Sequence, residues 1–297
     1  MELTICHANR LEADYKIYTL GLGREIVRTQ FNLTGSRLMH LYTLARQRQF
    51  NRIMNSEKML ILSGKNNQFK TNFKNKYKIF NDGVMSSLAS RHRITKIEEL
   101  NPFWIRQYHK LINDSELIYE STISFIKIYS IDILCVFNGR FFDSSAFIKA
   151  AKFTNVEYLV YDVNKSKSQY YFYNVSLHDI KANQNKAKKF FQPNNNYHLK
   201  IAEDYFYKRR FGKRTYEKSY TSGQKIGLIP NWLDKSKKII AIYPSSDDEY
   251  RFLSDSFKMK CLDQIKEIKE MGGILSNCSD QFQIIVRMHP NMIHMPT

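Results

Sequence analysis

The sequence predicts an α/β protein in which parallel strands alternate with helices. The chain has 297 residues, which is about the length of two domains. Two stretches, residues 131–160 and residues 237–288, each show a strand, a helical pattern and a second strand. That order is typical of a parallel βαβ unit. We therefore expect one domain around each unit, with residues 1–228 in the first and residues 229–297 in the second.

Helical spacing dominates the chain before the first unit. After a short strand at Leu3–Cys6, a helix is expected from Ser36 to Ala45. Asp82-Gly83 is expected to break the chain before a helical stripe formed by Val84, Met85, Leu88 and His92. Pro102 is typical of the first turn of a helix. Apolar residues then return every three or four positions from Tyr108 to Tyr129, which predicts one long amphipathic helix or two in succession.

The first βαβ unit begins where the apolar spacing changes. Ile131–Phe137 is a compact β-rich run of the kind found in buried parallel strands, and it ends at Asn138-Gly139-Arg140. Phe142–Phe153 has a helical pattern, and Val156–Val160 predicts the strand that returns beside the first.

The rest of the chain predicts the second βαβ unit and the elements that precede it. An aromatic-rich strand is expected at Tyr170–Val175 and a helix at Ile201–Phe211. Lys237–Tyr243 and Gln283–Met288 predict the two strands of the second unit. Between them we expect a helix that closes at Gly272-Gly273 and is marked by Met259, Leu262, Ile265 and Ile268.

The charge of the chain is strongly positive. Lys and Arg number 46 against 28 Asp and Glu, a formal net charge of +18. Residues 225–297 hold 10 Lys and Arg against 9 Asp and Glu, so nearly all of the excess belongs to the first domain. Such a surface favours anionic partners, namely nucleic acid, a phospholipid surface or a phosphorylated small molecule.

Cysteine spacing and hydropathy predict the compartment. The four cysteines lie far apart, which is typical neither of a disulfide framework nor of a zinc site, so we expect a reducing environment. The first residues lack a basic segment followed by an apolar one, and polar residues interrupt the most apolar stretch, Ile123–Phe137. We therefore expect no signal peptide, no membrane span and a cytoplasmic location.

Three loops follow the predicted strands, and ligands of open α/β sheets bind beyond the carboxyl ends of their strands. The loops are Asn138-Gly139-Arg140, Pro244–Glu249 and Arg287–Asn291. Arg140 offers a planar fork for a phosphate or a carboxylate, while a turn glycine followed by a solvated arginine is an equally good interpretation.

The second loop combines hydroxyls with carboxylates. Ser246 and Glu249 have the spacing of a capping box, which leaves Ser245 as the freer hydroxyl near a helix N-terminus that favours an anion. Asp247 and Asp248 would compete for the same positive end, or would serve as a base or a ribose ligand.

The third loop contributes His289, which Pro290 holds near the sheet edge. A lone histidine is more often structural than functional, but this one and the serines follow strands of one βαβ unit, so their loops are expected to face one crevice. The sequence holds no dinucleotide fingerprint, P-loop, D-x-D triplet or metal-ligand spacing.

The ordered motifs FNGR (137–140), IYPSSDDEY (242–250) and VRMHPN (286–291) resemble bacterial capsular and surface-polysaccharide biosynthesis proteins of the glycosyltransferase type with the GT-B fold. DGVMSSLASRHR (82–93) and the pair His178-Asp179 extend the resemblance. It implies two Rossmann-like domains that face a cleft, residues 1–228 on the acceptor side and residues 229–297 as a partial donor domain. Because only 67 residues follow Pro230, the second domain is expected to be incomplete and the chain to be a fragment.

The resemblance also implies roles for the loop residues. The nucleotide sugar would be held by Ser245, Ser246, Arg287, His289 and Asn291. The acceptor side would be formed by Asn138, Gly139 and Arg140. The candidates for the general base are Asp143, Asp247 and Glu249. No metal and no cofactor are expected, because protein dipoles and cations stabilise the departing phosphate in such enzymes.

The sequence therefore predicts a cytoplasmic glycosyltransferase-like protein that transfers a sugar from a nucleotide-sugar donor to a glycan or polyprenyl-phosphate-linked acceptor, held at the anionic inner membrane by its basic first domain. Nucleic acid is not the expected partner. The alternative is a nucleic-acid-binding protein, in which aromatic residues flank the basic cluster Lys208–Arg214. A further alternative is a catalytically inactive truncated fragment.

Overall fold

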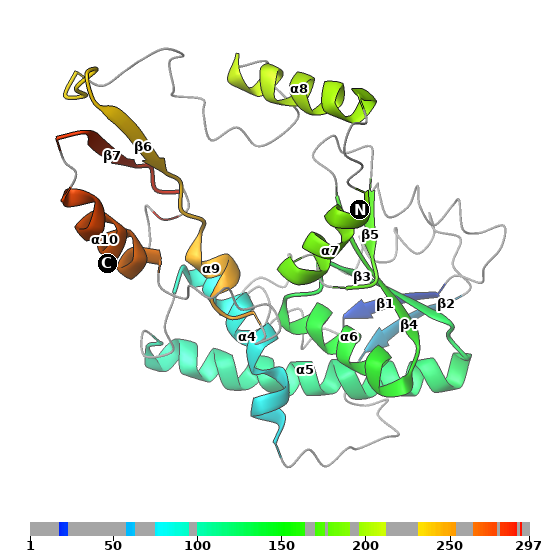
Figure 1. Cartoon of the computed structure of the whole chain (residues 1–297). Helices are drawn as coiled ribbons and strands as arrows, with labels where there is room; N and C mark the ends of the chain where they lie inside the picture. The colour runs from blue at the N-terminus through cyan, green and yellow to red at the C-terminus, as the bar shows by residue number, and fades with distance from the viewer. Residues whose placement is uncertain are drawn as a thin grey trace. The chain divides into compact units, whose positions relative to one another are not determined.

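A computed structural model shows a mixed α/β protein that is mostly helical and carries a few small sheets (Figure 1). The structure describes residues 18–22, 58–62, 75–94, 100–163, 170–175, 178–190, 196–211, 231–253, 264–277, 280–289 and 292. The chain divides into two compact units: unit 1 comprises residues 1–88 and 100–177, and unit 2 comprises residues 89–99 and 178–297. The predicted strand at Leu3–Cys6, the predicted helix at Ser36–Ala45 and the predicted boundary at residue 228 lie outside the described residues.

The predicted βαβ of unit 1 is confirmed. Strand β3 (Ile133–Phe137), helix α6 (Phe142–Thr154) and strand β4 (Glu157–Val163) follow one another, and β3 pairs parallel to β4. Strand β5 (Tyr170–Tyr173) pairs antiparallel to β4. The prediction that β3 is buried holds for one face only. Its core face packs with α6 and β4 through Leu134, Val136, Ile148, Ala151 and Val160, whereas Cys135 and Phe137 are exposed.

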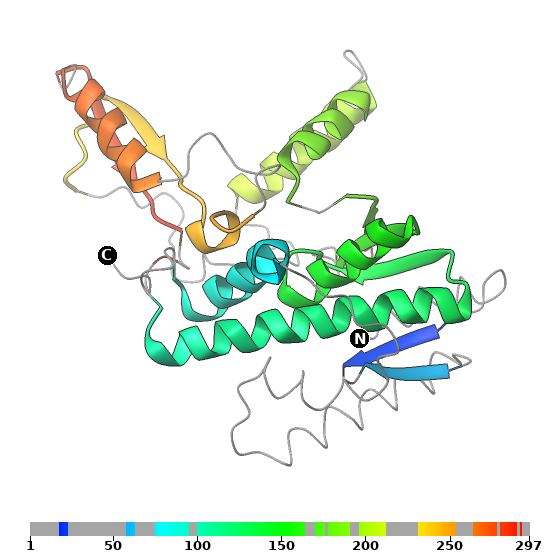
Figure 2. The same ribbon diagram turned by 90° about the horizontal axis from the view of Figure 1, so that it is seen from below.

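The apolar spacing before the sheet forms one long helix, α5 (Pro102–Tyr129), and not two. The Asn101 side chain accepts a hydrogen bond from the Trp104 backbone N–H at 3.0 Å, so a cap and a first-turn proline define its start. Helix α5 lies between α6 and the parallel pair β1 (Tyr18–Leu22) and β2 (Lys58–Leu62), as Figure 2 shows. These two strands were not predicted.

The predicted break at Asp82-Gly83 is wrong, because helix α4 (Lys76–His92) runs through it. Gly83 is buried, and a Cβ atom there would lie 2.8 Å from Ser145 Cβ and 3.1 Å from the Phe141 carbonyl oxygen. The glycine therefore permits the close approach of α4 to the start of α6. It does not end the helix.

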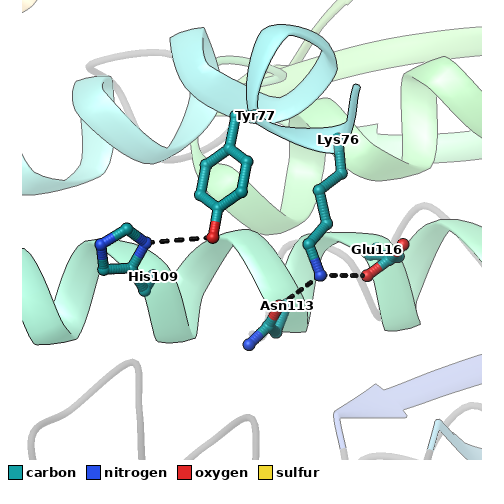
Figure 3. A network of polar contacts seen from close by, with 5 residues as sticks. All are labelled: Lys76, Tyr77, His109, Asn113 and Glu116. Atoms are coloured by element: carbon teal, nitrogen blue, oxygen red, sulfur yellow. Dashed lines mark hydrogen bonds and ion pairs between the residues drawn. The ribbon is translucent and has the colours of Figure 1, made fainter. Parts of the chain in front are cut away.

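Polar side chains join α4 to α5 within unit 1 (Figure 3). Lys76 Nζ lies 2.8 Å from Asn113 Oδ1 and 3.0 Å from Glu116 Oε2. Tyr77 Oη lies 3.1 Å from His109 Nδ1, and the two rings meet edge to face. Partly exposed contacts of this kind contribute little to stability, so we assign them to helix alignment.

Unit 2 contains the second parallel strand pair. Its strands β6 (Lys238–Ile242) and β7 (Phe282–Val286) confirm the two predicted strands. Helix α10 (Gln264–Ser276) continues past Gly272-Gly273, so the prediction that these glycines close the helix is wrong. The other helices of the unit are α7 (Ile180–Phe190), α8 (Asn196–Arg210) and the single turn α9 (Asp247–Tyr250). Helix α8 confirms a prediction, and α7 was not predicted.

In the part of the chain that the structure describes, no helix has the length and apolar character needed to cross a bilayer.

One helical glycine, Gly83, is closely packed and another, Gly272, is not, so we expect opposite effects when each is replaced by alanine. Gly83→Ala should destabilise the protein by about 1–3 kcal/mol, because the new methyl group overpacks against the α6 backbone. Gly272→Ala is the matched control: nothing lies within 4 Å of its Cβ position, so it should stabilise α10 by about 0.5–1 kcal/mol. Urea denaturation measures both changes. A neutral Gly83→Ala variant would contradict the close packing of α4 on α6.

Candidate functional site

Parallel pairing brings two of the predicted loops to one sheet edge in unit 2. Ile242 lies opposite Val286 at the carboxyl ends of β6 and β7, and the Arg287 N–H donates to the Ile242 carbonyl at 2.9 Å. The loop that carries Ser245 and Ser246 and the loop that carries His289 therefore start from the same edge.

The loop after β6 is held in place by Gln264, the first residue of α10. The Ser245 N–H donates to Gln264 Oε1 at 2.7 Å, and Gln264 Nε2 donates to the Ser245 carbonyl at 3.2 Å. Gln264 Nε2 also donates to the carboxylate of Asp247, which is buried. One side chain thus fixes both the backbone of the loop and the first carboxylate of α9.

Arg93 holds the second carboxylate of the loop. Its Nη1 lies 2.5 Å from Asp248 Oδ2, and the Asp248 side chain has no exposed surface. The Ser246 hydroxyl donates to the other oxygen of the same carboxylate. Asp248 therefore has an ion-pair partner and a hydrogen-bond donor, as a buried charge requires.

The backbone at Arg93 is unusual for an arginine. Its φ is +57°, in the left-handed region, and its N–H donates to the Ala89 carbonyl at 2.8 Å beyond the end of α4. Glycine is the usual residue there, and a side chain costs about 1–2 kcal/mol in this conformation. The presence of arginine indicates that its side chain makes a contact that offsets this cost.

The predicted capping box is wrong. Ser246 is the N-cap residue of α9, but its side chain makes no cap hydrogen bond, because the hydroxyl donates to Asp248 instead. Helix α9 has four residues, and Asp247, Asp248 and Glu249 fill its first turn. One acidic turn supplies neither the dipole nor the charge that favours an anion, so phosphate binding here needs side-chain cations.

The loop after β7 supplies a cationic side chain and an imidazole ring. Arg287 is exposed and His289 is half-buried, and the His289 carbonyl accepts from the Met292 N–H at 2.8 Å. Asn291 lies outside the described residues. The two residues of the predicted pair His178-Asp179 make different contacts. The His178 ring packs edge to face on the Tyr250 ring of α9, and the Asp179 carboxylate accepts the Ala182 N–H at the start of α7.

The predicted loop Asn138-Gly139-Arg140 lies in unit 1, and its residues are explained largely by the turn that they form. Asn138 and Gly139 both have positive φ. Glycine suits position 139 for two reasons: its φ is +84°, and a Cβ there would lie 2.9 Å from Ile148 Cδ1. Asn138 Nδ2 donates to Asp162 Oδ2 at 3.2 Å. The Arg140 guanidinium stacks on the Phe141 ring, 4.7 Å from its centroid.

Asp143 follows this loop at the start of α6. Burial raises the pKa of its carboxyl group above the ordinary value of 3.8, although the carboxylate also accepts the Ser144 N–H at 2.7 Å. Asp143 is one of the three candidates for a general base, and a raised pKa suits proton uptake near neutral pH.

Sequence reasoning identified the loops and missed the residues that fix them. Arg93 was noticed only as the last residue of the motif at 82–93, and Gln264 carried no signal at all. Both act on the loop across long stretches of chain, 155 and 17–19 residues, and such partners are visible only in three dimensions.

Comparison with known proteins adds no further assignment: no protein-family model, no curated protein and no solved structure matches the chain. Within the described residues, no three His, Cys, Asp or Glu side chains group as metal ligands would. The expectation of a metal-independent protein stays a prediction.

The raised pKa of Asp143 predicts how stability depends on pH. A folded pKa above the unfolded one means that stability falls as pH rises from the ordinary carboxyl pKa through the raised value. Asp143→Asn keeps the acceptor oxygen and removes the charge, so the variant should gain stability relative to the wild type as the pH rises above about 4. Urea denaturation across this range measures the gain. The exposed control Asp132→Asn should follow the wild type, and an Asp143→Asn profile parallel to the wild type would contradict the assignment.

Proposed function

We propose that the chain is a glycosyltransferase-like protein of capsule or surface-polysaccharide biosynthesis, with two Rossmann-like domains that face a cleft in the GT-B manner. It transfers a sugar from a nucleotide-sugar donor to a glycan or polyprenyl-phosphate-linked acceptor. It acts in the cytoplasm without a metal, and its basic surface holds it at an anionic membrane.

One observation carries the proposal: the parallel register of β6 and β7, which starts the Ser245–Ser246 loop and the Arg287–His289 loop from one edge. Nucleotides bind at this edge in open α/β sheets. In the proposed site, Arg287 and His289 contact the nucleotide phosphates, and the loop serines and Asn291 complete the pocket.

The acceptor side of the proposal rests on unit 1. Asn138, Gly139 and Arg140 follow β3 at the carboxyl edge of its sheet, and Asp143 follows them within one turn. We assign Asp143 the role of general base, which takes the proton of the acceptor hydroxyl as the bond to the sugar forms. The Asp247 carboxylate already accepts a hydrogen bond from Gln264, which makes Asp247 a weaker candidate.

A thermal-shift screen against CMP, UDP, GDP and CDP and their sugar conjugates tests the proposal. A ligand present at 100 times its dissociation constant should stabilise the protein by about 2.7 kcal/mol. Arg287→Ala and His289→Ala should each weaken binding about 10- to 100-fold, the effect of losing one charge-assisted hydrogen bond. Lys235→Ala, which removes an exposed cation at the amino end of β6, should bind as the wild type does. The absence of a shift with every nucleotide would contradict the proposal.

A second candidate function rests on the surface of α8. Its Tyr205, Phe206 and Tyr207 side chains are exposed, and Phe211, also exposed, lies 5.9 Å from the Arg210 guanidinium. Exposed rings beside cations are the features on which single-stranded nucleic acids stack.

Fluorescence anisotropy with a labelled single-stranded oligonucleotide decides whether α8 has this function. Phe206→Ala should then weaken binding by about 1–3 kcal/mol per lost stacking contact, with a steep dependence on salt. Phe153→Ala on α6 is the matched control, since that ring is 63% exposed against 68% for Phe206. Equal losses in the two variants, or no binding by the wild type, would remove the second candidate.

A further inference from the structure

We infer that Arg93 belongs to the donor site as a phosphate-binding residue, which Asp248 anchors at the carboxyl edge of β6 and β7. This inference rests on the proposed function and names a ligand contact that the motifs of the second domain do not contain. Arg93 lies in the segment 89–99, which is part of unit 2 together with residues 178–297.

The geometry places the guanidinium beside the loop. Asp248 accepts Arg93 Nη1 on one carboxylate oxygen and the Ser246 hydroxyl on the other, so a single carboxylate separates the arginine from the loop serine. Asp248 is 1% exposed and cannot move away without leaving a buried charge unpaired.

The hydrogen-bond donors of Arg93 that are unused within the described residues point to a ligand. A guanidinium has five N–H donors in a rigid fork, and one of them is used on Asp248 in the described part of the chain. The Arg93 side chain is 33% exposed, so part of it is open to solvent. A fork held by a carboxylate on one side suits a phosphate or diphosphate on the other.

The backbone shows that the position of the Arg93 side chain is enforced. Arg93 occupies a left-handed position at which glycine would be unstrained. Strain of this kind is retained where the side chain has a role that the surrounding structure enforces. Asp248 accounts for the anchoring of the side chain, and the planar fork is what distinguishes an arginine from a lysine as a phosphate ligand.

Binding of inorganic pyrophosphate and of the nucleotide panel, measured by isothermal titration calorimetry on the full chain, tests the inference. Arg93→Lys keeps the charge against Asp248 but loses the fork, so it should fold and bind about tenfold more weakly or worse. The double variant Arg93→Met/Asp248→Leu removes the ion pair as a whole, should also fold, and should lose binding. Arg91→Lys, an exposed arginine two residues earlier, is the matched control and should bind as the wild type does.

The outcomes separate this inference from the proposed function. If the wild type and Arg93→Lys bind with equal dissociation constants, Arg93 is structural only and the inference fails while the proposed function stands. If the wild type binds pyrophosphate through Arg93 but no nucleotide, the anion site stands and the proposed function fails. If the wild type binds neither probe, both fail.

Discussion

Parallel strand pairing is the constraint on which both units depend. Each sheet in the described residues contains a parallel pair, and parallel strands cannot be joined by a tight turn. The chain must cross back between them, which in unit 1 it does through α6. The carboxyl ends of the paired strands then share an edge. Polar loops after β3, β6 and β7 therefore gather at edges of the kind where α/β proteins bind their ligands.

Burial of the Asp248 carboxylate is the second constraint, and it organises the edge of β6 and β7. A charge without exposed surface needs a cation and a donor, which Arg93 and Ser246 supply. The same requirement explains why the Ser246 hydroxyl forms no capping box and why an arginine occupies a left-handed position. Local sequence rules give way here to a contact between distant segments.

The sequence was sufficient for the elements with a strong period and for the loops that end them. The spacing from Tyr108 to Tyr129 and the β-rich runs before residues 138, 243 and 287 all correspond to observed elements. Glycine was the main source of error, because Gly83 and Gly272 lie inside helices where a composition rule expects a break. Arg93 and Gln264 could not be found, since their partners are chosen by tertiary packing and by no local pattern.

Hydrogen exchange with and without the nucleotide that stabilises the chain most is the most direct test of the central claim, that the edge of β6 and β7 is the donor site. We expect amide exchange in residues 243–248 and 287–289 to slow together when the nucleotide binds, because both loops contact one ligand. Protection confined to unit 1 or to α8, with these two loops unchanged, would contradict it.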